Sequence, residues 1–185
     1  MIYLLSIRKK VSKKGVKKLR VFSIIALFIL SFILQSTLYQ YISVFDVMPN
    51  TNLILIILVS LFTNKKIGGV AGLVVGLLQD LLFGNAIGIH ALVYFLIGYF
   101  IGATNSNVSK ENFIIPFLYT FLFTIVANII FFIMYYFSAT NISFIEMIQD
   151  IAFVESIYNA ILSIFIYNFI KKLFVSPSLQ FGRRG

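Results

Sequence analysis

Six polar side chains lie within long apolar stretches of the sequence, and these residues are the candidates for chemistry. They are Gln79, Asp80, Asn85, His90, Asn128 and Glu155. A charged side chain near the middle of a bilayer costs roughly 2.5–3.5 kcal/mol on insertion scales. Each of the two carboxyl groups therefore needs a polar partner, access to water or a bound proton.

This set of side chains does not make a case for catalysis. A hydrolase needs a nucleophile, a general base and donors for an oxyanion, and one histidine with two carboxyl groups does not supply them. The chain has no cysteine, which excludes a thiol nucleophile, a thiolate metal site and a disulfide. With His90 as its one histidine, a zinc site made only of protein ligands is not expected. We therefore expect no enzymatic activity, no metal and no cofactor.

The composition indicates that these residues are positioned by helices in lipid. Hydrophobic residues make up 60% of the 185 residues, charged residues make up 11%, and the mean hydropathy is +0.99. A soluble domain of this size could not bury so much apolar surface. The composition therefore predicts an all-α integral membrane protein.

Six segments are expected to cross the membrane as a single helical bundle. Crossing takes about 20 apolar residues, with a range of about 17–25. The second segment is about 24 Å long, which is short but tolerable if the bilayer thins. The proline that opens it suits the first turn of a helix, where its missing N–H costs nothing. The predicted helices are Val21–Ser43, Pro49–Asn64, Ile67–Phe83, Ala86–Ala103, Phe113–Phe137 and Ile151–Ile170.

The positions of the basic residues predict that both ends of the chain are cytoplasmic. With six crossings, the cytoplasmic segments are 1–20, 64–66, 104–112 and 171–185, and they contain all 15 lysine and arginine residues. This distribution obeys the positive-inside rule. We expect a basic cytoplasmic arm at 1–20, a transmembrane domain at 21–172 and a cytoplasmic tail at 173–185, in a bacterial cell membrane.

Residues 8–20 hold eight of the basic side chains. We interpret this run as a topology signal that keeps the N-terminus inside. The alternative is attraction to anionic lipid, worth about 1 kcal/mol for each basic residue near the surface. The apolar stretch that follows is too long for a typical cleaved signal peptide. Nucleic-acid binding is not expected, because no aromatic residues interleave with the charges.

Depth along the predicted helices brings the polar side chains together in the outer half of the bundle. Asp80 lies five residues before Asn85 and His90 lies five residues after it, so a hairpin that turns at Asn85 places the two at similar depths. Gln79 and Asn85 could add hydrogen bonds. The cluster is interpreted either as a lock between helices or as a polar site for a solute or a partner segment. The other polar side chains placed in this half are Gln35, Asn128, Glu155 and Asn159.

Glycines recur at helical spacings in the third and fourth predicted helices. A small-xxx-small pattern lets a neighbouring backbone approach closely. The glycines are interpreted as packing within this bundle, with docking of a partner's transmembrane helix as the alternative. They are Gly68, Gly72, Gly76, Gly88, Gly98 and Gly102.

The stretch Met48–Gly102 carries a recognisable pattern. A Pro-Asn pair opens a short span, a small basic turn follows, and two motifs then occur. They are Gly72-x-x-x-Gly76-Leu77-Leu78-Gln79-Asp80-Leu81 and Gly88-Ile89-His90-Ala91-Leu92-x-Tyr94. In these features the chain resembles the rod shape-determining protein MreD family.

The resemblance implies a non-enzymatic membrane scaffold of the cell-elongation machinery, which directs lateral peptidoglycan synthesis. The partner it implies is the bitopic protein MreC, with the actin-like MreB and the RodA–transpeptidase complex engaged indirectly. No small-molecule substrate is expected on this interpretation. The resemblance also implies a fold related to the substrate-binding membrane subunits of energy-coupling-factor transporters.

A vitamin-type uptake subunit is therefore the alternative function. It predicts a pocket of hundreds of Å³ lined by polar and aromatic groups. Such subunits tend to carry an Ala-x-x-x-Ala contact motif in the first helix. Here the first helix has a single alanine, Ala26, which favours the scaffold.

Overall fold

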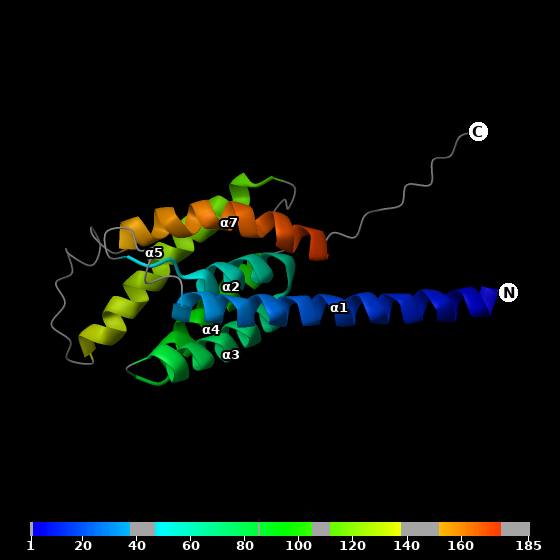
Figure 1. Cartoon of the computed structure of the whole chain (residues 1–185), viewed down its shortest axis with the longest axis horizontal. Helices are drawn as coiled ribbons and strands as arrows, with labels where there is room; N and C mark the ends of the chain where they lie inside the picture. The colour runs from blue at the N-terminus through cyan, green and yellow to red at the C-terminus, as the bar shows by residue number, and fades with distance from the viewer. Residues whose placement is uncertain (1, 38–46, 85, 105–111, 138–151, 175–185) are drawn as a thin grey trace.

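The computed structural model describes residues 2–37, 47–84, 86–104, 112–137 and 152–174, and within these ranges the chain is helical apart from short connections (Figure 1). The prediction of an all-α protein is confirmed for this part of the chain. The helices are α1 (Ile2–Thr37), α2 (Thr51–Phe62), α3 (Lys65–Phe83), α4 (Ile89–Thr104), α5 (Ile114–Phe137) and α7 (Phe153–Phe174).

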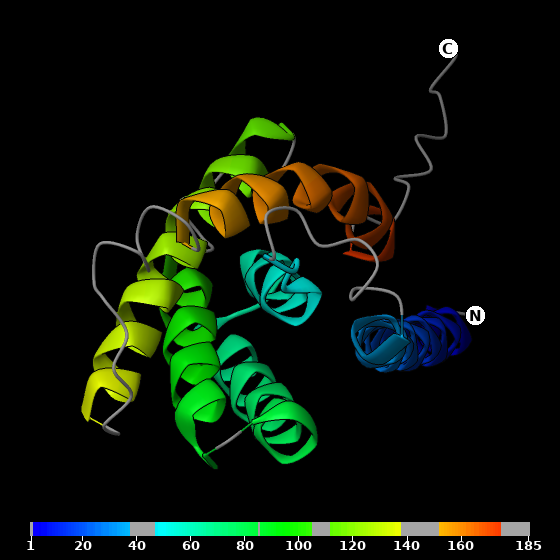
Figure 2. The same cartoon turned by 60° about the vertical axis from the view of Figure 1, so that its left-hand side comes forward.

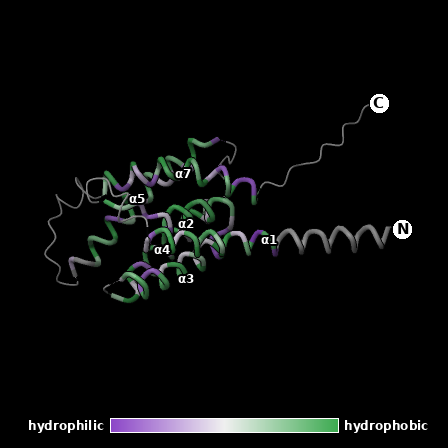
Figure 3. Tube along the Cα trace, in the orientation of Figure 1, coloured by the Kyte–Doolittle hydropathy of each residue, from purple (hydrophilic) through white to green (hydrophobic). Residues whose placement is uncertain are grey.

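Four of these helices are long and apolar enough to cross a membrane. They contain the candidate spans Lys18–Thr37, Lys65–Phe83, Ile114–Met134 and Phe153–Phe174. The helices α2 and α4 are apolar but shorter, with 12 and 16 residues. At 1.5 Å per residue, α2 is about 18 Å long, which is less than the roughly 30 Å of hydrocarbon in a bilayer. Six crossings therefore remain a prediction. Figure 3 shows apolar residues along all of these helices.

The short helix α2 forms the centre of the bundle. It packs against α1, α3, α4, α5 and α7, and residues 51–61 are all buried. Figure 2 views α2 nearly end-on, with α7 on one side, α3 and α4 on another, and α1 set apart from them. A helix that is apolar on every face is stable only when it is surrounded. The other helices of the bundle provide that environment.

The start of α2 differs from the prediction. Pro49 was expected in the first turn, but the helix begins at Thr51, after the N-cap residue Asn50. The side-chain oxygen of Asn50 accepts a hydrogen bond from the Leu53 N–H at 3.0 Å, which satisfies one of the free donors at the helix start. Asn64 caps α3 in the same way through the N–H of Ile67, also at 3.0 Å.

The helix α1 is longer than the predicted first span. Its 36 residues run without a break from Ile2, so the basic arm and the span form one helix of about 54 Å. Figure 1 shows its N-terminal part extending well beyond the bundle. Residues 38–43, which were included in the predicted span, lie outside the described residues. Arg20 marks the point where α1 meets the bundle, since its Nε donates to the Leu173 carbonyl at 2.9 Å.

The glycines of α3 and α4 pack these two helices against each other. A Cβ atom added at Gly72 would lie 2.1 Å from the carbonyl oxygen of Tyr94, and one at Gly76 would lie 2.5 Å from the Cα of Ala91. Gly68 and Gly98 face each other's backbones in the same way. The backbones therefore meet directly, as a small-xxx-small pattern allows. This face is used inside the bundle.

Gly88 does not belong to that packing surface. A Cβ atom there would meet nothing within 4 Å, so the expected role in helix packing is wrong. Its backbone φ of 104° is the reason for glycine at this position, because residues with a side chain rarely adopt such an angle. Gly88 forms the turn that leads into α4.

Substitution of Gly72 should separate α3 from α4. We expect Gly72→Ala to lower the free energy of unfolding by about 1–3 kcal/mol, because the new Cβ would overlap backbone atoms that cannot move aside. The control is Gly69→Ala on the same helix, where the nearest atoms belong to the Phe95 side chain at 3.1 Å. The free energy of unfolding of each variant is measured by SDS titration in mixed micelles. Equal losses for the two variants would contradict the packing described here.

Candidate functional site

Asp80 caps the N-terminus of α4 from the last turn of α3. Its Oδ2 accepts hydrogen bonds from the backbone N–H of Gly88 at 2.8 Å and of Ala91 at 3.1 Å. Its Oδ1 accepts from the backbone N–H of His90 at 3.0 Å. A carboxyl group at a helix N-terminus satisfies donors that the helix itself leaves free and interacts favourably with its dipole.

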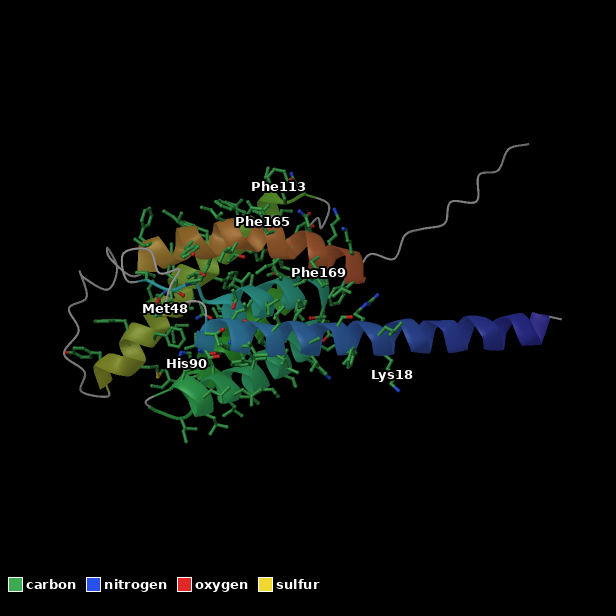
Figure 4. All side chains as sticks on the ribbon, in the orientation of Figure 1. Lys18, Met48, His90, Phe113, Phe165 and Phe169 are labelled. Atoms are coloured by element: carbon green, nitrogen blue, oxygen red, sulfur yellow. The ribbon has the colours of Figure 1, made fainter. Side chains whose placement is uncertain are left out.

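His90 completes the group around Asp80. Its Nδ1 lies 2.8 Å from the Asp80 Oδ1, so the contact expected between these two residues is present. The imidazole ring also packs against the rings of Tyr94 and Phe131, with centroids 5.7 and 4.8 Å away. Figure 4 shows His90 at the end of the bundle opposite Lys18. Asp80 thus binds both the backbone and the side chain of the start of α4.

This cap explains why α4 begins later than predicted. The sequence suggested a start at Ala86, but the helix begins at Ile89, directly after the glycine turn. Asp80 supplies from α3 the acceptor that an N-cap residue supplies in most helices. Asn85, which was expected to add a hydrogen bond, lies outside the described residues.

Gln79 belongs to a different group of polar side chains. Its Oε1 accepts a hydrogen bond from the Asn52 Nδ2 at 2.7 Å, and the same nitrogen donates to the Gln35 Oε1 at 3.0 Å. The hydrogen bond expected of Gln79 is thus made to Asn52 of α2. Asn52 is fully buried at the first turn of α2 and links α1 to α3.

A third group joins α5 and α7. The Nδ2 of Asn128 donates to Glu155 Oε2 at 2.8 Å, and the Nδ2 of Asn159 lies 3.3 Å from Glu155 Oε1. The Oδ1 of Asn159 in turn accepts a hydrogen bond from the backbone N–H of Asn50 at 2.9 Å. The structure therefore brings Asn128 and Glu155 together, but they do not touch Asp80.

The start of α2 connects these groups. The Tyr94 hydroxyl donates to the Asn50 Oδ1 at 2.9 Å, and the Tyr94 ring packs against His90. Asn50 thereby contacts α4 and α7, while Asn52 contacts α1 and α3. Neither asparagine was among the residues predicted for the polar cluster. The sequence feature that could have identified them is their position on either side of Thr51, at the start of a short span.

This arrangement positions helices rather than a reacting group. The oxygens of Asp80 each accept from the start of α4, and the amides of Asn52, Asn128 and Asn159 bind other side chains. Most of these bonds cross between helices or fix a helix start, and the contact of Asn159 with Glu155 lies within α7. The chemistry that the site supports is the hydrogen-bonded lock considered from the sequence.

The family model for the rod shape-determining protein MreD matches residues 16–176. The chain belongs to the MreD family. No curated protein matches it, and no solved structure does. Because it is a member of this family, the protein has a role in rod shape determination as a structural membrane protein. The match includes the whole polar cluster, whereas the first turns of α1 lie before it.

Removal of the Asp80 cap should destabilise this MreD protein strongly. We expect Asp80→Ala to cost at least about 2 kcal/mol, because three backbone donors and His90 lose their acceptor in a largely apolar setting. Asp80→Asn should fall between the wild type and the alanine variant, since one acceptor oxygen remains. The measurement is the free energy of unfolding in mixed micelles.

The control is the exposed turn before α5, where the Asn112 Oδ1 accepts from the Ile114 N–H at 3.3 Å. Asn112→Ala should cost only about 0.5–1 kcal/mol, the lower end of the range for lost N-caps. If the two alanine variants were equally stable, Asp80 would not be the residue that fixes α3 to α4.

Proposed function

We propose that this MreD protein is a non-enzymatic scaffold that binds MreC within the cell-elongation machinery. The main support is that Asp80 and the amide side chains are hydrogen-bonded within the bundle, where they fix the helices relative to one another. Together with membership of the MreD family, this supports a protein that offers a rigid surface to partners. MreB, RodA and its transpeptidase would be reached through MreC, so that lateral peptidoglycan synthesis follows the scaffold.

The cavities favour this function over vitamin uptake. A vitamin-binding subunit presents polar and aromatic groups to an open pocket. Three cavities bounded by described residues, of 240, 460 and 530 Å³, lie beside α1 and have mostly apolar walls. The side chains that could recognise a polar vitamin are bonded to each other instead. One cavity lies between α1 and α7 and is lined by residues such as Leu30, Leu34, Leu55, Leu162 and Ile166.

The glycine packing restricts where MreC can bind. Gly68, Gly72 and Gly76 face α4, so a partner helix cannot use this stripe without displacing α4. The outward faces of the bundle carry large exposed apolar side chains, which are open to a partner or to lipid. Examples are Leu77 on α3, Leu122 on α5 and Phe165 on α7.

Partner capture tests the proposed function. A photo-crosslinking residue at position 77, 122 or 165 should capture MreC in native membranes, and depletion of this protein should turn rod-shaped cells into rounded ones. Asp80→Ala should reduce both MreC recovery and rod shape, whereas Asn112→Ala should change neither. Membrane levels of each variant are compared to separate loss of binding from loss of protein.

Two results would overturn the proposal. The first is rod shape maintained without the protein, with no MreC captured from any outward face. The second is a tightly bound vitamin that co-purifies with the protein in equal amounts. The latter would restore the uptake subunit as the function.

The proposed topology is tested by cysteine labelling, because the chain has no cysteine of its own. Asn64 lies between α2 and α3, and the 74%-exposed Ile87 lies between α3 and α4. If α3 crosses the membrane, Ile87→Cys should react with an impermeant maleimide added to intact spheroplasts. Asn64→Cys should react only after the membrane is opened. Reaction of both from outside would contradict six crossings with cytoplasmic ends.

A further inference from the structure

A long cleft runs between α1 and α3. Two cavities of 530 and 460 Å³ share the lining residues Val21, Ile24, Ile25, Ile67 and Ala71, so they form one continuous space. Phe28, Lys66 and Val75 line only the larger cavity, whereas Arg20 and Val59 line only the other one. The shared walls are aliphatic, and polar side chains, among them Thr63 and Asn64, line the part between α2 and α3. We call this space the α1–α3 cleft.

The two walls of the α1–α3 cleft do not pack against each other along its length. The helix α1 meets the bundle mainly through α2 and α7, and Figure 2 shows it standing apart from α3. Farther along α1, one turn beyond the lining residue Phe28, Phe32 stacks on Phe83 of α3, with ring centroids 6.3 Å apart. Apolar side chains that have no neighbouring atoms on one side lose dispersion energy. When the protein is in a membrane, hydrocarbon must therefore fill this space.

The opposite end of the cleft is basic on both sides. Arg20 lines it from α1, and the exposed Lys66 lines it from α3. Within the described residues, Arg20 uses two of its five N–H donors on the carbonyls of Leu173 and Phe174. The neighbouring Lys65 is oriented differently, with its Nζ over the Tyr99 ring of α4 at 5.9 Å.

The dimensions of the cleft match one leaflet of a bilayer. Phe32 follows Arg20 by 12 residues, which is about 18 Å along a helix. Half of the hydrocarbon core is about 15 Å thick. The basic end therefore lies at the level of lipid headgroups when the apolar part lies among acyl chains.

We propose that the α1–α3 cleft binds an anionic phospholipid. An acyl chain fills the aliphatic part, and the phosphate group lies between Arg20 and Lys66. A transmembrane helix of a partner or of a second copy fits this place less well, because the positive-inside rule puts its own lysines and arginines at the same level. The phospholipid brings negative charge instead. This inference does not depend on MreC binding.

A tryptophan reporter tests the proposal, because the chain contains no tryptophan. The reporter is Ile25→Trp in the cleft, and the control is Leu118→Trp on α5. The two positions are 52% and 47% exposed, and they lie four and five residues after Val21 and Phe113, the predicted cytoplasmic ends of their spans. Each purified variant is placed in phosphatidylcholine vesicles that contain either brominated phosphatidylglycerol or brominated phosphatidylcholine at the same mole fraction.

Brominated phosphatidylglycerol should quench Ile25→Trp several-fold more effectively than brominated phosphatidylcholine, whereas Leu118→Trp should show little preference. In the Ile25→Trp background, Lys66→Gln should lower the preference about five-fold, which corresponds to about 1 kcal/mol for one basic residue near the surface. Lys66→Arg should retain it. Lys65→Gln removes the same charge from the same turn and should leave the preference unchanged.

Three results would overturn the proposal. Equal quenching of both reporters by the two lipids would mean that the cleft holds unselected bulk lipid. Equal effects of Lys65→Gln and Lys66→Gln would mean that the preference reflects overall charge. Protection of Ile25→Trp from both lipids, relieved on dilution of the protein in the vesicles, would mean that a second copy fills the cleft.

Discussion

The structure depends on satisfying two helix starts that lie inside the bundle. The first N–H groups of α2 and α4 cannot be paired within their own helices, and an unpaired donor in hydrocarbon costs several kcal/mol. Asn50 supplies the acceptor for α2, and Asp80 supplies it for α4. Because Asp80 belongs to α3, and Asn50 also binds Tyr94 and Asn159, each cap also joins separate helices.

The close packing of α3 and α4 makes the Asp80 cap possible. At Gly76 the backbone of α3 meets the backbone of α4 at Ala91. Asp80 lies one turn further along the same face, which places its carboxyl group at the free N–H groups that begin α4. A larger residue at position 76 would hold the helices apart and move the carboxyl group out of reach. The spacing Gly72-x-x-x-Gly76-x-x-x-Asp80 is therefore a single structural unit.

Local spacing explains which features could be predicted from the sequence. The contact of Asp80 with His90 follows from their equal distance from a turn, and the packing role of Gly72 follows from the four-residue repeat. The bond between Asn50 and Asn159 spans 109 residues, and no periodicity indicates it. The start of α4 was also misplaced, because its cap comes from the preceding helix and not from the residues just before it.

Polar contacts at two levels, together with the packing of Phe28 into the core, fix the position of α1. Between helices in lipid, apolar surface supplies little driving force, since acyl chains are equally apolar. Arg20 binds the last carbonyls of α7, while Ser31 and Gln35 bind Thr51 and Asn52 at the start of α2. These two attachments lie near opposite ends of the membrane-spanning part of α1. Between them, Phe28 packs into the apolar core of the bundle, while the exposed Ile25 lines the cleft. The helix is therefore held on one face by the bundle and borders the cleft with the other.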